Sequence, residues 1–281
     1  MVNETVIAQT FNKDLANEYG KICGNYSLWS NLTIFWGCGT NLHRSPYNAR
    51  NHEYYSEDAV LTSGQAVAFI SGGKEYGVII APKHLAFNDT EINRTGVSVF
   101  MTEQQARENE LRGTQAAIED AGALGVMTAF NRVGITAANA HTGLLKNILR
   151  GEWGFKGLES QDFIMNPNYA VLKEYALNGG TMTTFTGENT MAAVSEKFAY
   201  WTTENVGQDT ELMSAIKQAM TWQAYALANS NALDGMASST RLVSVRTWYD
   251  NALVAVQVVF AALTVLAAAM YVLNDRKSKK Q

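Results

Sequence analysis

Apolar positions recur at helical spacing at the start of the chain and give way to short apolar runs further on. In residues 4–28, Ile7, Phe11 and Leu15 begin a series that repeats every three or four residues, which predicts one helix. Residues 33–38 (TIFWGC) are β-branched and aromatic, which predicts a strand. Because segments of these two kinds alternate along the chain, we expect an α/β fold with a parallel sheet or barrel.

The same patterns place the remaining elements. Strands are expected at residues 76–81, 123–130, 181–185 and in the segment that ends at Asp162. Helices are expected at residues 60–71, 103–120, 141–150, 169–178 and 211–230. Since α/β barrels keep their chemistry at the carboxyl ends of strands, Asp162 is a candidate catalytic carboxylate. Its alternative role is to cap the helix or turn that follows, as Asp often does.

Residues 252–273 contain no charged side chain and are long enough to cross a hydrocarbon layer of about 30 Å. Trp248 and Tyr249 precede this stretch and Tyr271 lies near its end, as interfacial aromatic residues do. A basic tail follows, with Arg276, Lys277, Lys279 and Lys280. The positive-inside rule then predicts a single-pass protein of the cell membrane, with a cytoplasmic tail and an extracellular soluble domain. The alternative is a buried core helix.

The first residues have neither the basic nor the apolar segment of a signal peptide. An extracellular domain without an export signal is expected to be the tail of a longer protein. A tail-anchored cytosolic protein is the alternative, but its basic tail would face the wrong side. We expect a soluble domain at residues 1–235, a linker at 236–251, a transmembrane helix at 252–273 and a basic tail at 274–281.

The composition argues against a disordered chain and against a protein that binds nucleic acid. With 47% hydrophobic and 17% charged residues, the 281-residue chain is expected to form a core rather than to be disordered. The net charge is −4, and the rest of the chain is more acidic still once the basic tail is set aside. Such an acidic domain is a poor candidate for binding nucleic acid. Cys23 and Cys38 have no metal-ligand spacing, and buried thiols are favoured over one disulfide.

Polar motifs follow the expected strands in a recognisable order. They are NLHRSPYNARNHEYYSED at residues 41–58, KHLAFNDTEINR at 83–94, MTAFN at 127–131 and GEWGFKGLESQD at 151–162. They resemble the motifs of glycoside hydrolase family 3, the β-glucosidase and β-xylosidase group, over about residues 12–234. The resemblance implies an incomplete TIM-like (β/α) barrel, followed here by one C-terminal transmembrane helix. It also implies a retaining glycosidase that acts on a terminal β-linked glucoside or xyloside.

The resemblance implies roles for particular residues. Asp162 is implied to be the catalytic nucleophile. The hydroxyls of the sugar are implied to be held by Arg50, Lys83, His84 and Arg94. These residue types suit the chemistry, because Arg and Lys keep a neighbouring carboxylate ionised and donate hydrogen bonds to vicinal hydroxyls. No metal or other cofactor is implied, and the acid/base is implied to come from a second α/β domain, a partner that this chain lacks.

Several features depart from the family pattern. Phe130 stands where many members have Tyr, Phe163 where Trp often follows the nucleophile, and Met182 where many have Asp. Both phenylalanines remain candidate substrate-binding residues. The first barrel strand of the family would precede Asn12, where there is no room for it. Two rivals to an enzyme are therefore a membrane-anchored carbohydrate-binding fragment that does not cleave sugar, and a structural membrane protein with a decayed site.

Ion pairing is the alternative role of the charged residues in these motifs. Arg50 has three acidic partners nearby in the sequence, which are Glu53, Glu57 and Asp58. Pairs of this kind are common at protein surfaces. We expect Glu91 to support the site by pairing with Arg94.

Overall fold

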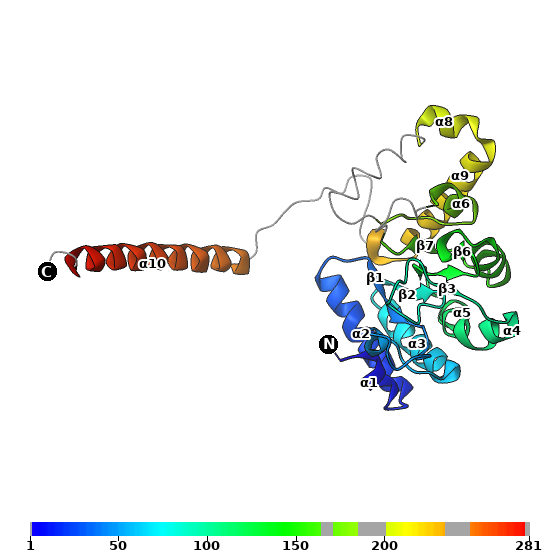
Figure 1. The fold of residues 1–281 in the computed structure, drawn as a ribbon, viewed down its shortest axis with the longest axis horizontal. Helices are drawn as coiled ribbons and strands as arrows, with labels where there is room; N and C mark the ends of the chain where they lie inside the picture. Colours follow the sequence, from blue (N-terminus) through cyan, green and yellow to red (C-terminus); the bar gives the residue numbers. More distant parts are fainter. Residues whose placement is uncertain (1, 164–170, 185–200, 234–247, 279–281) are drawn as a thin grey trace. The chain divides into compact units, whose positions relative to one another are not determined.

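The computed structural model describes residues 2–163, 171–184, 201–233 and 248–278. The chain divides into two compact units, residues 1–234 and 235–281, which are considered separately (Figure 1). The first unit contains an α/β fold, as the alternation of strand and helix patterns predicts.

A four-stranded parallel sheet forms the centre of the first unit. Its strands are β1 (Ile34–Gly39), β2 (Ile79–Leu85), β4 (Gly125–Thr128) and β7 (Leu158–Gln161), and they lie in the order β1-β2-β4-β7. All neighbouring pairs are parallel, and an isolated bridge between Ser160 and Met182 continues the order beyond β7. The carboxyl ends of all four strands therefore meet at one edge, which is where such sheets bind ligands.

Helices and short turns connect these strands. Among the described residues, the α-helices of the first unit are α1 (Glu4–Ala8), α2 (Lys13–Trp29), α3 (Ala59–Lys74), α4 (Glu103–Gln105), α5 (Arg112–Glu119), α6 (Leu172–Leu177), α8 (Thr203–Gln208) and α9 (Thr210–Ala228). Other helical turns are η1 (Asn51–Glu53), η2 (Ala106–Glu110), η3 (Ala138–Ala140), η4 (Gly143–Glu152) and η5 (Asn231–Leu233). A second sheet joins β3 (Ser98–Val99), β5 (Arg132–Val133) and β6 (Thr136–Ala137) in the order β3-β5-β6.

The structure differs from three of the expected elements. In place of the strand expected at 181–185, residues 181–184 contain only an isolated bridge at Met182, and residue 185 lies outside the described residues. The single helix expected at 4–28 is two helices, because Phe11 adopts a left-handed conformation (φ 52°) and the Asn12 side chain caps the start of α2. The strand expected at 76–81 begins only at Ile79, because Gly77 turns the chain with a φ of 69°. The strand then continues to Leu85, so that Lys83 and His84 lie within it.

Alternating residues of the strands pack on opposite faces of the sheet. Ile80 packs with Phe69 and Ile70 in a cluster that joins the sheet to helices α2 and α3, which lie side by side in Figure 1. The cluster includes Cys23 and Cys38, and both are buried free thiols, as the sequence analysis favoured. On the other face, Ile79 and Leu158 pack against Ala226 of helix α9.

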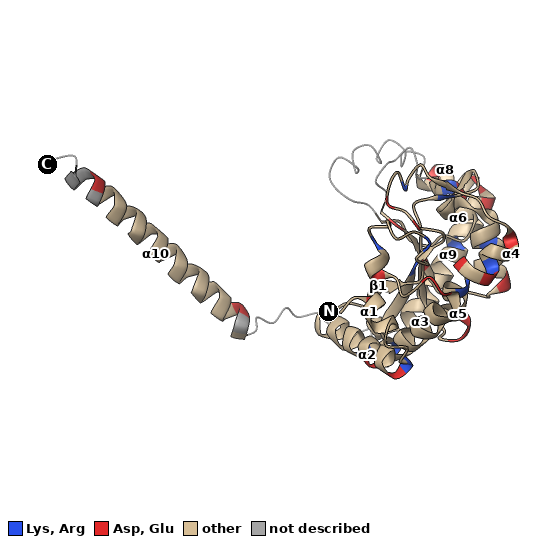
Figure 2. Ribbon diagram, turned by 60° about the horizontal axis from the view of Figure 1, so that its bottom comes forward, with Lys and Arg blue, Asp and Glu red and all other residues tan. Residues whose placement is uncertain are grey.

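The second unit contains helix α10 (Trp248–Ser278). Its apolar span, Asp250–Leu273, is 24 residues long and is the one candidate membrane span among the described residues. Figure 2 shows this helix without charged residues except near its ends. The helix expected at 252–273 is thus confirmed, whereas its place in a membrane stays a prediction. The expected linker at 236–251 is shorter, because α10 begins at Trp248; residues 236–247 lie outside the described residues.

Candidate active site

The carboxyl edge of the sheet brings together the motifs that the sequence analysis singled out. The loop after β1 carries Arg50, strand β2 carries Lys83 and His84, and the segment after it carries Arg94. Asp162 follows β7 directly. The parallel order of the strands is what makes residues more than a hundred positions apart neighbours.

Three cations and two carboxylates alternate at this edge, and we call them the cation–carboxylate network. Glu53 accepts a hydrogen bond from Arg50 Nε at 2.5 Å and pairs with Lys83 Nζ at 2.9 Å. Glu91 lies 3.5 Å from Arg50 NH1 and 2.7 Å from Arg94 NH1. The expected pairing of Glu91 with Arg94 is confirmed. Arg50 pairs with Glu53, so the ion-pair alternative is confirmed, whereas its role in holding a sugar stays a prediction.

The network fixes the charge of Glu53. Burial opposes ionisation of this carboxyl, but hydrogen bonds and charges from Arg50 and Lys83 outweigh it and lower the pKa to about 2. Glu53 is therefore an ionised spacer that separates two cations and is unable to donate a proton near neutral pH. Asp58, another partner considered for Arg50, instead caps helix α3 by accepting a hydrogen bond from Leu61 N.

Asp162 lies against this network with a largely buried side chain, which is 9% exposed. Burial raises its pKa, and the opposing influences are the Phe163 N–H and the charges of three cations: Arg50, Arg94 and Lys83. The Phe163 N–H donates to Asp162 Oδ1 at 2.8 Å, which leaves Oδ2 facing His84 Nε2 at 3.5 Å. Asp162 thus has one oxygen held by a backbone N–H and one that faces the imidazole of His84. Its capping alternative concerns residues 164–170, which lie outside the described residues.

His84 is held rigidly within the sheet edge. Asn41 Oδ1 accepts the His84 N–H at 2.7 Å, and Asn41 Nδ2 donates to the His84 carbonyl at 3.0 Å. Burial, followed by the charges of Arg50, Lys83 and Arg94, keeps the pKa of His84 well below its usual range, so the ring is neutral.

Two side chains contact Nδ1 of this ring. Asn88 Nδ2 donates to the Tyr54 hydroxyl at 2.9 Å, and that hydroxyl lies 3.3 Å from His84 Nδ1. Asn41 Oδ1, which can only accept a hydrogen bond, lies 3.2 Å from the same nitrogen, while Nε2 faces Asp162. Asn41, Tyr54 and Asn88 were missed as site residues, although all three stand in the motifs.

The two aromatic candidates differ in their surroundings. Phe130 is buried, and its ring lies 4.4 Å from the guanidinium carbon of Arg94, which makes it a platform for that cation. Phe163 is 45% exposed beside Asp162. Phe130 thus positions a basic residue of the site, and Phe163 is free to contact a ligand.

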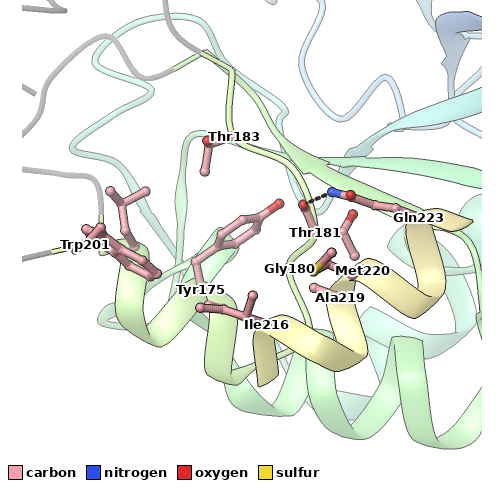
Figure 3. A pocket seen from close by; sticks show the side chains of 11 residues that line it. Tyr175, Gly180, Thr181, Thr183, Trp201, Ile216, Ala219, Met220 and Gln223 are labelled. Atoms are coloured by element: carbon pink, nitrogen blue, oxygen red, sulfur yellow. Dashed lines mark hydrogen bonds between the residues drawn. The ribbon is translucent and has the colours of Figure 1, made fainter. Parts of the chain in front are cut away.

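Helices α6 and α9 support the strand that ends at Asp162. The Tyr175 hydroxyl lies 2.9 Å from the Glu159 carbonyl and 2.7 Å from the Met182 carbonyl. Gln223 of α9 donates to the Thr181 carbonyl, as Figure 3 shows. Tyr175, Thr181 and Gln223 line an apolar pocket between the two helices. Their hydrogen bonds hold β7 in place. Sequence patterns gave no sign of them, because the partners are distant in the chain.

Comparison with known proteins places this arrangement in a family. Residues 3–193 match the model of the glycosyl hydrolase family 3 N-terminal domain. The chain is 35% identical over 159 residues to the probable beta-glucosidase J of Emericella nidulans, covering 57% of this chain and 19% of that protein. It is 37% identical over 167 residues to a beta-glucosidase of Ruminococcus albus, covering 59% and 18%.

A solved structure shares the fold as well. Beta-glucosidase 3B from Thermotoga neapolitana in complex with glucose matches with a TM-score of 0.74 and 28% identity, over 83% of this chain and 32% of that one. The chain spans about a fifth of the length of the curated relatives that it matches. Because the family model covers well over half of the residues, the chain belongs to glycosyl hydrolase family 3.

Proposed function

We propose that this chain forms the sugar-binding, nucleophile-bearing part of a retaining β-glucosidase that acts on terminal β-linked glucosides or xylosides. The observation that carries the proposal is the position of Asp162. It is a buried carboxylate at the end of a strand, with three cations close enough to act on its charge and the neutral ring of His84 beside it. This combination favours an anionic nucleophile in contact with a hydroxyl-rich ligand.

The mechanism follows from these groups. Asp162 attacks the anomeric carbon and forms a covalent glycosyl ester while the bond to the leaving oxygen breaks. Burial raises the pKa of the attacking carboxylate, and the charges of Arg50, Lys83 and Arg94 oppose this shift and favour the ionised form; their spare N–H groups donate to hydroxyls of the sugar. A water molecule then attacks the ester, which releases the sugar with its original configuration.

We propose that a second domain supplies the proton for the leaving oxygen. Glu53 is unsuited to this task because its pKa is about 2, and Glu91 is engaged by Arg50 and Arg94. The matched relatives are about five times as long as the aligned segment, which leaves ample sequence for such a domain in proteins of this kind.

Covalent labelling tests the proposed function. A 2-deoxy-2-fluoro-β-glucoside with an acidic phenol as leaving group needs no general acid, and its fluorine slows the breakdown of the ester. We expect mass spectrometry to find one sugar on the peptide that contains Asp162. A protein that binds glucose but never becomes labelled would instead be a carbohydrate-binding module, and labelling of another residue would contradict the role of Asp162.

Replacing Lys83 by Ala tests the sugar-binding role of the cation–carboxylate network. Lys83→Ala is expected to weaken binding of a neutral monosaccharide ligand by about 1.5–3 kcal/mol, the value of a charge-assisted hydrogen bond, or about 10- to 150-fold in Kd. Isothermal calorimetry measures this change. Lys156→Ala is the control, because Lys156 is an exposed residue of the GEWGFKG motif. Equal affinities for the two variants would show that Lys83 does not bind the sugar.

We further propose that α10 spans the cell membrane, with Trp248 outside and Lys279 inside. The 24-residue apolar span, whose one charged residue is Asp250 at its first position, and the basic tail support this orientation. External protease on intact cells is expected to remove the soluble domain and to leave a C-terminal tag protected, which an immunoblot detects. Loss of the tag under the same treatment, with a cytosolic marker intact, would show that the orientation is the opposite of the one proposed.

A further inference from the structure

Three charged residues outside the cation–carboxylate network form a second cluster. Asp89 and Glu110 are buried, with 6% and 4% of their surfaces exposed. Arg44 Nε lies 3.2 Å from Asp89 Oδ2, and Arg44 NH1 lies 3.5 Å from Glu110 Oε1. Asp89 Oδ1 and Glu110 Oε2 accept no hydrogen bond from the described residues. One guanidinium therefore serves two buried carboxyl groups.

The charges of this cluster do not balance when both carboxyls are ionised. Burial raises the pKa of Asp89, opposed only by Arg44. Burial and the charge of Asp89 raise the pKa of Glu110, again opposed by Arg44. No other charged side chain of the described residues contributes to either shift. Two carboxyls that share one cation in this way titrate as a pair, and the neutral cluster holds one proton.

The cluster joins three segments, two of which also carry residues of the cation–carboxylate network. Arg44 lies in the loop after β1, Asp89 in the segment after β2, and Glu110 at the end of η2. Next to Asp89, the Asn88 side chain donates to the Tyr54 hydroxyl at 2.9 Å and to Glu91 Oε1 at 3.2 Å. A shift of Asp89 would therefore disturb the residue that orients His84 and the carboxylate that holds Arg94.

We propose that Arg44, Asp89 and Glu110 form a proton-sharing cluster that positions the sugar-binding loops, and that sugar binds best while the cluster holds one proton. The inference rests on the proposed function, because the pocket it acts on is the sugar pocket. Arg44, Asp89 and Glu110 are positioning residues, which act through Asn88 and Glu91 and do not touch the sugar themselves.

Loss of the shared proton has a defined consequence. When both carboxyls are ionised, the cluster has a buried net charge of −1, and repulsion between Asp89 and Glu110 favours movement of the Asp89 segment toward water. Sugar affinity is then expected to fall as pH rises. Because binding and protonation are linked, sugar binding must in turn draw a proton onto the cluster at the pH where it is half-ionised.

Calorimetry of the full chain in detergent micelles tests this linkage with 4-nitrophenyl 1-thio-β-glucoside, a neutral ligand that resists hydrolysis. Titrations from about pH 5 to about pH 8, the range over which raised carboxyl pKa values lie, give the Kd and the protons taken up. The natural protein is expected to lose at least about fivefold in affinity over this range, the lower end of typical coupling between sites, and to take up protons on binding. Glu110→Gln is expected to lose this part of the pH dependence and of the proton uptake.

Glu108→Gln is the matched control, because Glu108 lies on the same turn of η2 but is exposed. It is expected to behave as the natural protein. Equal pH dependence and equal proton uptake in the natural protein and Glu110→Gln would overturn the positioning role. If none of the three proteins binds the thioglucoside, the proposed function fails, and the positioning role fails with it.

Unfolding measures the shared proton without any sugar. Raised folded-state pKa values mean that the folded protein holds protons that the unfolded chain releases, so stability falls as pH rises from the ordinary carboxyl range toward neutrality. Relative to Glu110→Gln, the unfolding constant of the natural protein is expected to rise by up to about tenfold per pH unit there. Glu4 and Glu159, whose burial raises their pKa values to about 8 and about 7, are common to both proteins and cancel. Parallel pH profiles would rule out the shared proton.

Discussion

Asp162→Asn is expected to reduce hydrolysis of a dinitrophenyl β-glucoside by roughly 10⁴- to 10⁶-fold, the cost of removing the nucleophile from a covalent hydrolase. The substrate is chosen because its phenol leaves without a proton, so that the result depends on Asp162 and not on the acid/base. The amide keeps the shape of the side chain and its contact with the Phe163 N–H but lacks the charge that attacks the anomeric carbon. Steady-state and burst kinetics measure the loss.

A second variant separates the nucleophile from a purely structural carboxylate. Asp162→Gly opens space beside the anomeric carbon, and azide is expected to restore part of the rate by attacking there, with an α-glucosyl azide as product. Asp120→Asn, at an exposed position after α5, is the control and should react at the natural rate. An Asp162→Gly variant of undiminished activity, or an azide product of β configuration, would show that another group attacks the sugar.

The motif residues were predictable because chemistry and strand ends coincide in this fold. Lys83 and His84 stand at the end of an apolar run, Asp162 directly follows β7, and Arg50 lies in the polar loop after β1; parallel pairing brings these strand ends together. The sequence could therefore indicate both the kind of fold and the edge of the sheet that carries the site. One ion pair at that edge could also be predicted, because Glu91 and Arg94 are only three positions apart in the sequence.

The remaining features depend on contacts that local patterns do not contain. The break at Phe11 is a single left-handed residue within an unbroken apolar series, so periodicity does not register it. The β3-β5-β6 sheet consists of two-residue strands, which are too short for any alternation to show. The contacts of Tyr54 with His84 and of Asp89 with Arg44 join segments 30 or more positions apart, and only the folded sheet edge brings them together.

Arg150, the residue before the motif GEWGFKG, holds the turn of that motif in place. Arg150 NH1 donates to the carbonyls of Phe155 and Gly157 at 3.0 and 2.8 Å, and its Nε and NH2 donate to Gly179 O at 3.1 and 2.7 Å. The guanidinium lies 3.8 Å from the ring centre of Trp222 and 4.9 Å from that of Phe155. Arg150 therefore clamps the turns on both sides of β7.

This clamp leads to the largest expected effect on stability. Burial lowers the pKa of Arg150 to about 10, with Glu159 and Tyr175 opposing the shift, so the side chain remains charged at neutral pH. Arg150→Met would keep the aliphatic stem and the packing on Trp222 but leave three carbonyls without their donor. We expect a loss of about 3–5 kcal/mol in the free energy of unfolding, typical of removing one partner from a buried charged network.

Denaturant unfolding of the full chain in micelles measures the loss, with the transition of the first unit followed by tryptophan fluorescence. Lys146→Met is the matched control, because Lys146 precedes Arg150 by one helical turn on η4 and is exposed; it is expected to change stability by less than about 0.5 kcal/mol. Arg150→Lys should recover only part of the loss, since one ammonium cannot reach three carbonyls in the fixed geometry of a guanidinium. If Arg150→Met unfolds like the control, the turns beside β7 are held by packing alone, and Asp162 owes its position to Tyr175 and helix α9 instead.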